Sequence, residues 1–258
     1  MPEPADRPTG ILAEPNPDRA LLAALDGIVY ARHPVRTHLV TDADDAVAVV
    51  RRYAAPLDID TALVAVSERM VAITQGRSHP MDSIRPGSLA RLLVRFVTRP
   101  GYGIGLGTAE TMQLAISEVG APRILLAAAV SALTKPFGVH GLFYRIAGRQ
   151  AAAIDGPTSY TISPYNRAAT LGPRDPNGAA RRIADAIDMP VAVIDANDAG
   201  CNVLGASEGL NRRWVERLFA DNPLGQAAEQ TPICVVRRVE SPAGELLPPE
   251  PRRRLTPP

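Results

Sequence analysis

A short apolar run in the second half of the chain is followed at once by residues that could bind a cation. The run Val191–Ile194 predicts a buried strand, and Pro190 stands at its start, where a missing N–H costs least. Directly after the run come Asp195, Asn197, Asp198 and Gly200. Oxygen ligands at a strand end suit Mg²⁺ or Mn²⁺, but the same residue types also form Asx-rich turns without any metal.

A second apolar run, Ala151–Ile154, ends in the same way, with Asp155 and Gly156. It predicts a second strand that delivers a carboxylate at its carboxyl end. We therefore expect Asp155 and Asp195 to share one Mg²⁺ or Mn²⁺, although nothing in the local sequence requires the two segments to meet.

Composition narrows the class of protein. The 258 residues suffice for one large domain or two small ones, and with 46% apolar but only 4% aromatic residues the core must be mostly Ala, Val, Leu and Ile. A net charge of +1 argues against a general nucleic-acid or membrane-surface partner. Cys201 and Cys234 are too few for a disulfide framework. Without a visible signal peptide or spanning segment, we expect a cytoplasmic protein.

The expected elements alternate irregularly, which predicts an α+β fold with mixed sheets and helices in a single body. Helices are expected over 20–25, 46–53, 88–98, 109–119, 175–187 and 211–220. Strands are expected over 33–40, 61–66, 142–146, 151–154, 191–194 and 233–237, with 142–146 and 151–154 as a hairpin. The alanine-rich stretch 124–133 fits a buried strand or a helix equally well. The body should span 20–240, between proline-rich disordered tails at 1–19 and 241–258.

Two further patterns each have two interpretations. Arginines recur every four residues at Arg91, Arg95 and Arg99, so they lie on one face of the predicted helix. This face could bind an anion, or it could be an ordinary solvated face. The glycine-rich stretch 101–108 precedes a predicted helix, where it could cradle a phosphate or act as a hinge. Its spacing matches neither the dinucleotide-binding fingerprint nor a P-loop.

The order of several segments resembles the coenzyme F-420 gamma-glutamyl ligase family, over about residues 35–238. The segments that carry the resemblance are Val35-Arg36-Thr37 with Asp44-Asp45, Ser67–Arg77, Ile154-Asp155, Asp175-Pro176, Ile194-Asp195, Gly225-Gln226, and Val235-Val236-Arg237. These ligases use GTP and a divalent metal to join glutamate to a deazaflavin precursor. The resemblance implies a gamma-glutamyl-ligase-like α+β fold, in one compact body that can comprise two intertwined subdomains, and a homodimer.

The resemblance also implies roles for residues. Asp155, Asp195 and Gln226 match positions near the metal, beside Asn197 and Asp198 from the strand-end pattern. Nucleotide contacts are expected from Arg36, Thr37, Arg69, Arg77, Gly225 and Gln226. The implied chemistry is an acyl-phosphate route, in which a small carboxylate substrate is phosphorylated and an amine then displaces phosphate.

Three departures from the family pattern mark a divergent branch with an altered nucleotide site. Ile73 stands where the family has its second lysine, Ala196 replaces Thr or Ser, and Gly156-Pro157 replaces a serine–asparagine pair. Arg69 is the cation nearest to Ile73, so it either takes over the phosphate contact or is an ordinary surface arginine. The alternative to a ligase is a non-catalytic ligand-binding homologue that kept the fold.

Overall fold

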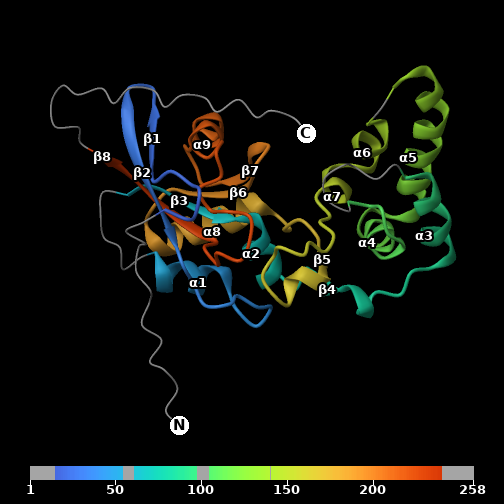
Figure 1. Cartoon of the computed structure of the whole chain (residues 1–258), viewed down its shortest axis with the longest axis horizontal. Coiled ribbons are helices and arrows are strands. Elements are labelled where there is room, and N and C mark those ends of the chain that lie inside the picture. The colour runs from blue at the N-terminus through green and yellow to red at the C-terminus, as the bar shows by residue number, and fades with distance from the viewer. Residues whose placement is uncertain (1–14, 55–60, 98–104, 140, 240–258) are drawn as a thin grey trace, which may run out of the picture.

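The computed structural model describes residues 15–54, 61–97, 105–139 and 141–239, and it has an α+β fold in a single body (Figure 1). A curled six-stranded sheet has the order β1-β2-β8-β3-β6-β7. All neighbouring strands in it are antiparallel except β3 and β6, which run parallel. Its strands are β1 (Leu22–Leu25), β2 (Ile28–Val35), β3 (Thr61–Ser67), β6 (Val191–Asn197), β7 (Gly200–Ala206) and β8 (Ile233–Val239).

The two faces of this sheet are covered by different helices, because successive side chains of a strand point to opposite faces. Val64 and Val66 of β3 pack with α1 (Ala46–Tyr53), α2 (Glu68–Thr74) and α8 (Pro176–Ile187). The alternate positions Leu63 and Ala65 pack instead with Val215 and Leu218 of α9 (Arg212–Leu218). Both faces of β3 are fully buried, so this strand forms the centre of the core.

A separate group of helices lies to one side of the sheet (Figure 1). Its own apolar core includes Leu106, Met112, Ile124 and Ile154. The group comprises α3 (Ser88–Leu93), η2 (Val94–Phe96), α4 (Ala109–Val119), α5 (Ala121–Thr134), η3 (Lys135–Phe137), α6 (Leu142–Ala147) and α7 (Arg149–Ala152). A two-stranded sheet of β4 (Ser78–Pro80) and β5 (Ala168–Thr170), together with the short turns η1 (Met81–Ser83) and η4 (Tyr165–Arg167), lies between this group and the large sheet.

The helix predicted over 20–25 is wrong, because this segment forms β1. Asp26 and Gly27 both have positive φ values, 52° and 79°, as a two-residue hairpin turn requires, and Leu25 pairs with Ile28 across the turn. The Asp-Gly pair was the available signal, and cross-strand pairing overrides the helix propensity of Ala23 and Ala24. The next strand also lies earlier than predicted, at Ile28–Val35.

The hairpin predicted over 142–154 is also wrong, since both segments are helices, α6 and α7. Gly148 separates them with a φ of 92°, so it breaks a helix rather than turning a strand. Asp155 therefore follows a helix and not a strand, although its backbone N–H and C=O each bond to Thr170 at 2.9 Å. The ambiguous stretch 124–133 is helix α5.

The structured body begins before residue 20. Asn16, which the sequence prediction assigned to the N-terminal tail, is only 3% exposed, and its side-chain amide donates to Thr231 Oγ1 at 2.8 Å. The predicted disordered tails at 1–14 and 241–258 lie outside the described residues, as do Arg99 and residues 101–104 of the glycine-rich stretch.

No single helix in the described ranges is both long enough and apolar enough to span a membrane. The helices Ala109–Val119 and Ala121–Phe137 meet both criteria only as a pair, which is bent by 117°.

The packing of β7 on α8 gives a test of the fold. A Cβ added at Gly205 would lie 2.0 Å from the carbonyl oxygen of Pro176, and both backbones are held in regular elements. We expect Gly205→Ala to cost about 3 kcal/mol, as overpacking does, and so to lower Tm by about 6–12 °C. Gly87→Ala is the control, because its nearest contact is the flexible amide of Gln113 at 3.3 Å. Equal Tm values for the two variants would contradict this packing.

Candidate functional site

A cleft of about 1170 Å³ is lined by residues of the large sheet and of the helical group. The sheet side contributes the carboxyl ends of β3 and β6, and the other side contributes α6, α7 and the segment that follows α7. Eight of the ten site residues predicted from sequence line this cleft: Thr37, Arg69, Asp155, Asp195, Asn197, Asp198, Gly225 and Gln226. These residues come from five separate segments, so only the tertiary fold brings them together.

The parallel pair β3 and β6 places two acids side by side at one edge of the sheet. Ser67, the last residue of β3, pairs with Ile194 of β6, so the next residues, Glu68 and Asp195, emerge at the same level. Carboxyl ends of neighbouring parallel strands are the usual place for a ligand in an open sheet. Glu68 was missed in the sequence prediction, although it directly follows the predicted strand 61–66.

Asp155 reaches the same cleft from beyond α7 and is held there by Arg69. The Arg69 guanidinium donates to Asp155 Oδ2 at 2.5 Å and to Thr161 Oγ1 at 3.2 Å. Asp155 is 61% exposed and Arg69 is 28% exposed, so this ion pair contributes about 1 kcal/mol at most to stability. The effect of the ion pair is local, because it holds the guanidinium of Arg69 among the acids of the cleft.

The three acids Glu68, Asp155 and Asp195 interact electrostatically. Burial raises the pKa of Glu68 well above its usual value, and the charges of Asp195 and Asp155 raise it further, while Arg69 lowers it. Burial and the charge of Asp155 also raise the pKa of Asp195, against the opposing effects of Asn197 and Arg69. Arg69 thus offsets only part of the negative charge that these acids bring into the cleft.

The turn after β6 is engaged in contacts of its own. Asp198 accepts from Arg19 at 2.8 Å, and in the amide orientation that satisfies both groups Gln226 donates to Asp198 at 2.9 Å. Asn197 donates weakly to Asp195 at 3.4 Å and accepts from the Ala199 N–H at 2.9 Å. Asp198 therefore anchors the Gln226 loop, which leaves Asp195 as the acid of this strand end with the fewest protein partners.

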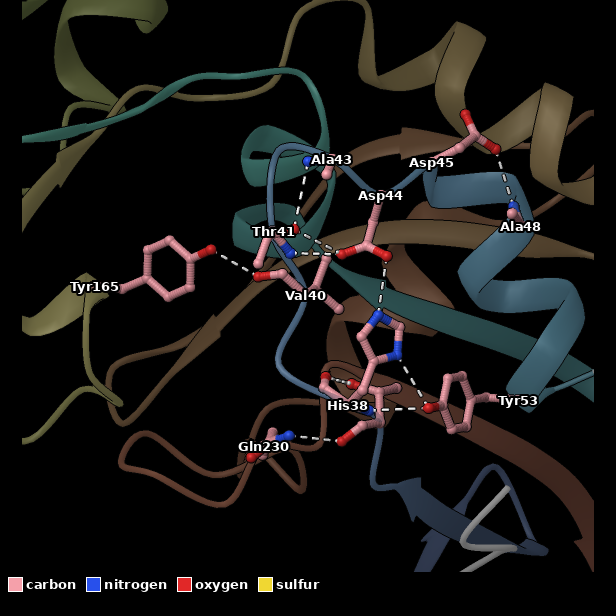
Figure 2. A network of polar contacts seen from close by, with 11 residues as sticks. His38, Val40, Thr41, Ala43, Asp44, Asp45, Ala48, Tyr53, Tyr165 and Gln230 are labelled. Carbon is pink, nitrogen blue, oxygen red and sulfur yellow. Dashed lines mark hydrogen bonds and ion pairs between the residues drawn. The ribbon is translucent and has the colours of Figure 1, made fainter. Parts of the chain in front are cut away.

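The loop between β2 and α1 forms another edge of the cleft, and Figure 2 shows the contacts that fix it. The two ring nitrogens of His38 lie 3.0 Å from the Tyr53 hydroxyl and 2.9 Å from Asp44 Oδ1. Tyr165 donates to the Val40 carbonyl at 2.6 Å, and Gln230 donates to the Thr37 carbonyl at 2.7 Å. Hydrogen bonds to Asp44 from Thr41 and His38 lower its pKa against the effect of burial, so it stays ionised as the anchor of the loop.

The predicted nucleotide contacts occupy different places. Thr37 is buried in the cleft wall, but its hydroxyl donates to the His38 carbonyl at 2.8 Å. Arg36 is exposed and does not line the cleft. Arg77 does not line it either, because it is 4% exposed and donates to Glu118 and to the Gly172 carbonyl, both at 2.6 Å. Its role is therefore structural, at the junction of the sheet and the helical group.

Among the described residues, the carboxylates of the cleft do not form a cage of protein ligands around a metal ion, but they fit a site in which only one or two carboxylates bind the cation. Within the described ranges, no three His, Cys, Asp or Glu residues are grouped as a metal cage. Mg²⁺, however, is usually held by one or two carboxylates together with water and phosphate oxygens. The uncompensated charge of Asp195 and Glu68 fits that mode, in which Asp195 and Asp155 would hold Mg²⁺ or Mn²⁺ and a bound phosphate would complete the shell.

Neither cysteine lines the cleft, and neither thiol is prepared for nucleophilic chemistry. Burial and the nearby charges of Asp195 and Glu216 raise the pKa of Cys201 to about 12, so the thiol stays protonated at neutral pH. Cys234 is fully buried, and burial raises its pKa as well.

Comparison with models of known protein families and with curated proteins finds no match to this chain.

The acid cluster gives a test through pH. Because the pKa of Glu68 is raised in the folded protein, the folded state binds more protons than the unfolded chain as pH rises from about 4.5. The free energy of unfolding therefore falls as pH rises through that window. We expect Glu68→Gln to raise Tm at pH 8 in EDTA and to reduce the difference in Tm between pH 5 and pH 8.

Glu208→Gln is the control for this test, because Glu208 is an exposed acid that does not line the cleft. It should leave both Tm values within about a degree of the wild type, since surface substitutions have small effects. A Glu68→Gln protein less stable than wild type at pH 8 would contradict the raised pKa.

Proposed function

We propose that this protein is a ligase that uses a nucleotide such as GTP and Mg²⁺ or Mn²⁺ to form an amide bond, as its resemblance to the coenzyme F-420 gamma-glutamyl ligase family implies. The observation that carries the proposal is the convergence of Asp155, Asp195 and Glu68 in one large cleft beside Arg69 and the Gly225-Gln226 loop. An acidic edge that lacks full charge compensation suits a divalent cation and its phosphate ligands.

The proposed reaction has two steps. An oxygen of the substrate carboxylate attacks the terminal phosphorus of the nucleotide, so an acyl phosphate forms and the nucleoside diphosphate leaves. The amine then attacks the acyl carbon, the C–O bond to phosphate breaks, and the amine proton passes to a base. The divalent cation supplies charge neutralisation for the phosphates when bound.

The chain's own residues would position and shield these reactants. Glu68 lines the cleft and its pKa is raised by burial and by the charges of Asp195 and Asp155, so it is a candidate to accept the amine proton. Arg69 would leave Asp155 and contact phosphate oxygens, since a guanidinium binds both groups well. The anchored His38 loop and the Gln226 loop would exclude water from the acyl phosphate.

A non-catalytic ligand-binding protein is the second candidate, and Ile73 favours it. This side chain is 6% exposed, belongs to the apolar core and lines the cleft where the family has a lysine. Purified protein should be screened by thermal shift against GTP and ATP with Mg²⁺ or Mn²⁺, since ligands of the native state raise Tm. Phosphate release that requires both a carboxylic acid and an amine would identify a ligase, whereas a nucleotide-dependent rise in Tm without turnover would identify a binding protein.

Asp195 and Asp198 form a matched pair of neighbouring acids for testing the metal. Asp195→Asn removes a carboxylate with few protein partners, whereas Asp198→Asn alters one that already binds Arg19 and Gln226. We expect Asp195→Asn to weaken Mg²⁺-dependent GTP binding at least about tenfold, as loss of a charged contact does. Asp198→Asn should change the Kd by less than about threefold, and isothermal titration would measure both. Equal losses would argue against Asp195 as the metal ligand.

We also propose that the protein is a homodimer and that helix α5 supplies its interface. Large apolar side chains on α5 and η3 are strongly exposed, among them Leu126 at 58%, Leu133 at 71% and Phe137 at 84%. Exposed apolar patches of this kind mark protein interfaces. Light scattering at about 10 µM protein, a concentration at which nanomolar interfaces are saturated, should give a dimer for the wild type and a monomer for Leu133→Gln. A wild-type monomer would remove this proposal.

A further inference from the structure

The two walls of the cleft differ in charge. The sheet wall carries the acids Glu68, Asp195 and Asp198, whereas the wall formed by α6, α7 and the segment after α7 carries Arg149, Tyr144 and Tyr160 and one acid, Asp155, which is paired with Arg69. A nucleotide and its cation would occupy the acidic wall. The opposite wall would then contact a different part of the bound ligands.

Among the positively charged side chains that line the cleft, Arg149 differs from the others because, within the described residues, it forms no hydrogen bond or ion pair. The side chains there that can carry positive charge are His38, Arg69 and Arg149. His38 is bound to Asp44 and Tyr53, and Arg69 is bound to Asp155 and Thr161. Arg149 is exposed, and within the described part of the chain its guanidinium makes no hydrogen bond or ion pair. All five of its N–H donors remain available to a ligand.

The backbone that carries Arg149 is fixed in place. Gly148 turns the chain between α6 and α7 with a φ of 92°, and Arg123 donates to the Ile146 carbonyl at 2.8 Å just before this turn. After the turn, Ala151 is 1% exposed and Ile154 is 2% exposed in the core of the helical group. Arg149 therefore extends from a rigid support, which reduces the entropy that a ligand must overcome.

Two aromatic side chains, Tyr144 and Tyr160, line the same cleft as Arg149. Tyr144 is 36% exposed, and its ring packs edge-on against Phe143 with centroids 5.5 Å apart. Burial raises the pKa of Tyr144, so its phenol is neutral at physiological pH. Tyr160 is 57% exposed. Neutral rings and a guanidinium that line one cleft offer a ligand both apolar surface and an anion contact.

We propose that Arg149, Tyr144 and Tyr160 form a subsite for an organic carboxylate, in which Arg149 binds the carboxylate and the two rings contact the body of the ligand. A guanidinium suits this role because its planar fork matches a carboxylate with two parallel hydrogen bonds. The assignment of this carboxylate to a ligase substrate rests on the proposed function, but the binding itself does not. The carboxylate could belong to the acid that is activated or to an amino acid that supplies the amine.

The test measures binding of benzoate and of L-glutamate by ligand-observed NMR, without nucleotide or metal. Arg149→Gln should weaken binding of the preferred carboxylate at least about tenfold, as loss of a charged hydrogen-bonding partner does. Arg149→Lys should recover part of the affinity, because it restores the charge without the fork. Arg145→Gln is the matched control, since Arg145 is an exposed arginine one helix earlier that does not line the cleft.

The two probes distinguish the sources of the carboxylate. Stronger binding of benzoate, lost on Tyr160→Ala, would identify an acid with a flat apolar body. Stronger binding of L-glutamate, unaffected by Tyr160→Ala, would identify the amino-acid component and would remove the rings from the subsite. Benzamide, which lacks the charge, should bind at least about tenfold more weakly than benzoate.

Two outcomes would overturn the proposal: no binding of either carboxylate at millimolar concentration, or equal affinities in Arg149→Gln and Arg145→Gln. Binding of Mg²⁺ and GTP is measured separately on the same variants and should be unchanged in Arg149→Gln. If carboxylate binding depends on Arg149 while GTP fails to bind, the subsite stands and the proposed ligase function fails.

Discussion

Arg77 holds together the two parts of the molecule that form the cleft. Its backbone carbonyl accepts from Leu171 at 3.0 Å, and its side chain donates to Gly172 and to Glu118 of α4. The Arg77 and Glu118 side chains are only 5% and 13% exposed, so each charge depends on the other for compensation. Loss of one member of such a pair leaves a buried charge and costs about 3–5 kcal/mol. This junction therefore links α4 of the helical group to the segment after α2.

The acidic edge of the sheet is a second consequence of the fold. Parallel pairing of β3 with β6 brings Glu68, which directly follows β3, to the level of Asp195, which lies in the carboxyl-terminal part of β6. Burial and repulsion from Asp195 and Asp155 raise the pKa of Glu68, and burial and repulsion from Asp155 raise the pKa of Asp195, so the folded protein bears a cost for holding these acids together. Proteins commonly retain such a cost where a ligand relieves it. The Arg69–Asp155 ion pair relieves part of it from within the chain.

The proposed function and the proposed carboxylate subsite place two kinds of ligand in one cleft. A cation with phosphate groups would bind at the wall that carries Glu68 and Asp195, and an anion with an apolar body would bind at the wall that carries Arg149. A reaction that joins a nucleotide-activated acid to an amine needs both kinds of contact within one enclosed space. The loops that carry His38 and Gln226 are tied to each other through Gln230, which bonds to both the N–H and the carbonyl of Thr37. These ties preorganise the space between the walls.

Local sequence determined the helices and strands that are marked by their own apolar pattern or capping residues. Helices α1 and α4 begin and end where their apolar periodicity predicts, and Asp175-Pro176 starts α8 as a cap followed by a first-turn proline should. The apolar runs of β3 and β6 were also recognisable, because a strand buried on both faces is apolar at every position. Asp195 was recognised as the acid after the second of these runs, whereas Glu68, which follows the first, was missed.

Tertiary structure decided the rest. Segment 22–25 is a strand because β2 pairs with it, and segments 142–147 and 149–152 are helices because their apolar residues fill the core of the helical group. The sequence could not distinguish Arg69, which lines the cleft, from Arg77, which does not, because the two arginines lie in one short segment and differ only in what packs around them. Single residues report local propensity, whereas burial and charge pairing depend on partners distant in the chain. For the same reason Asp155 was expected at the end of a strand and instead reaches the cleft beyond a helix, beside Arg69.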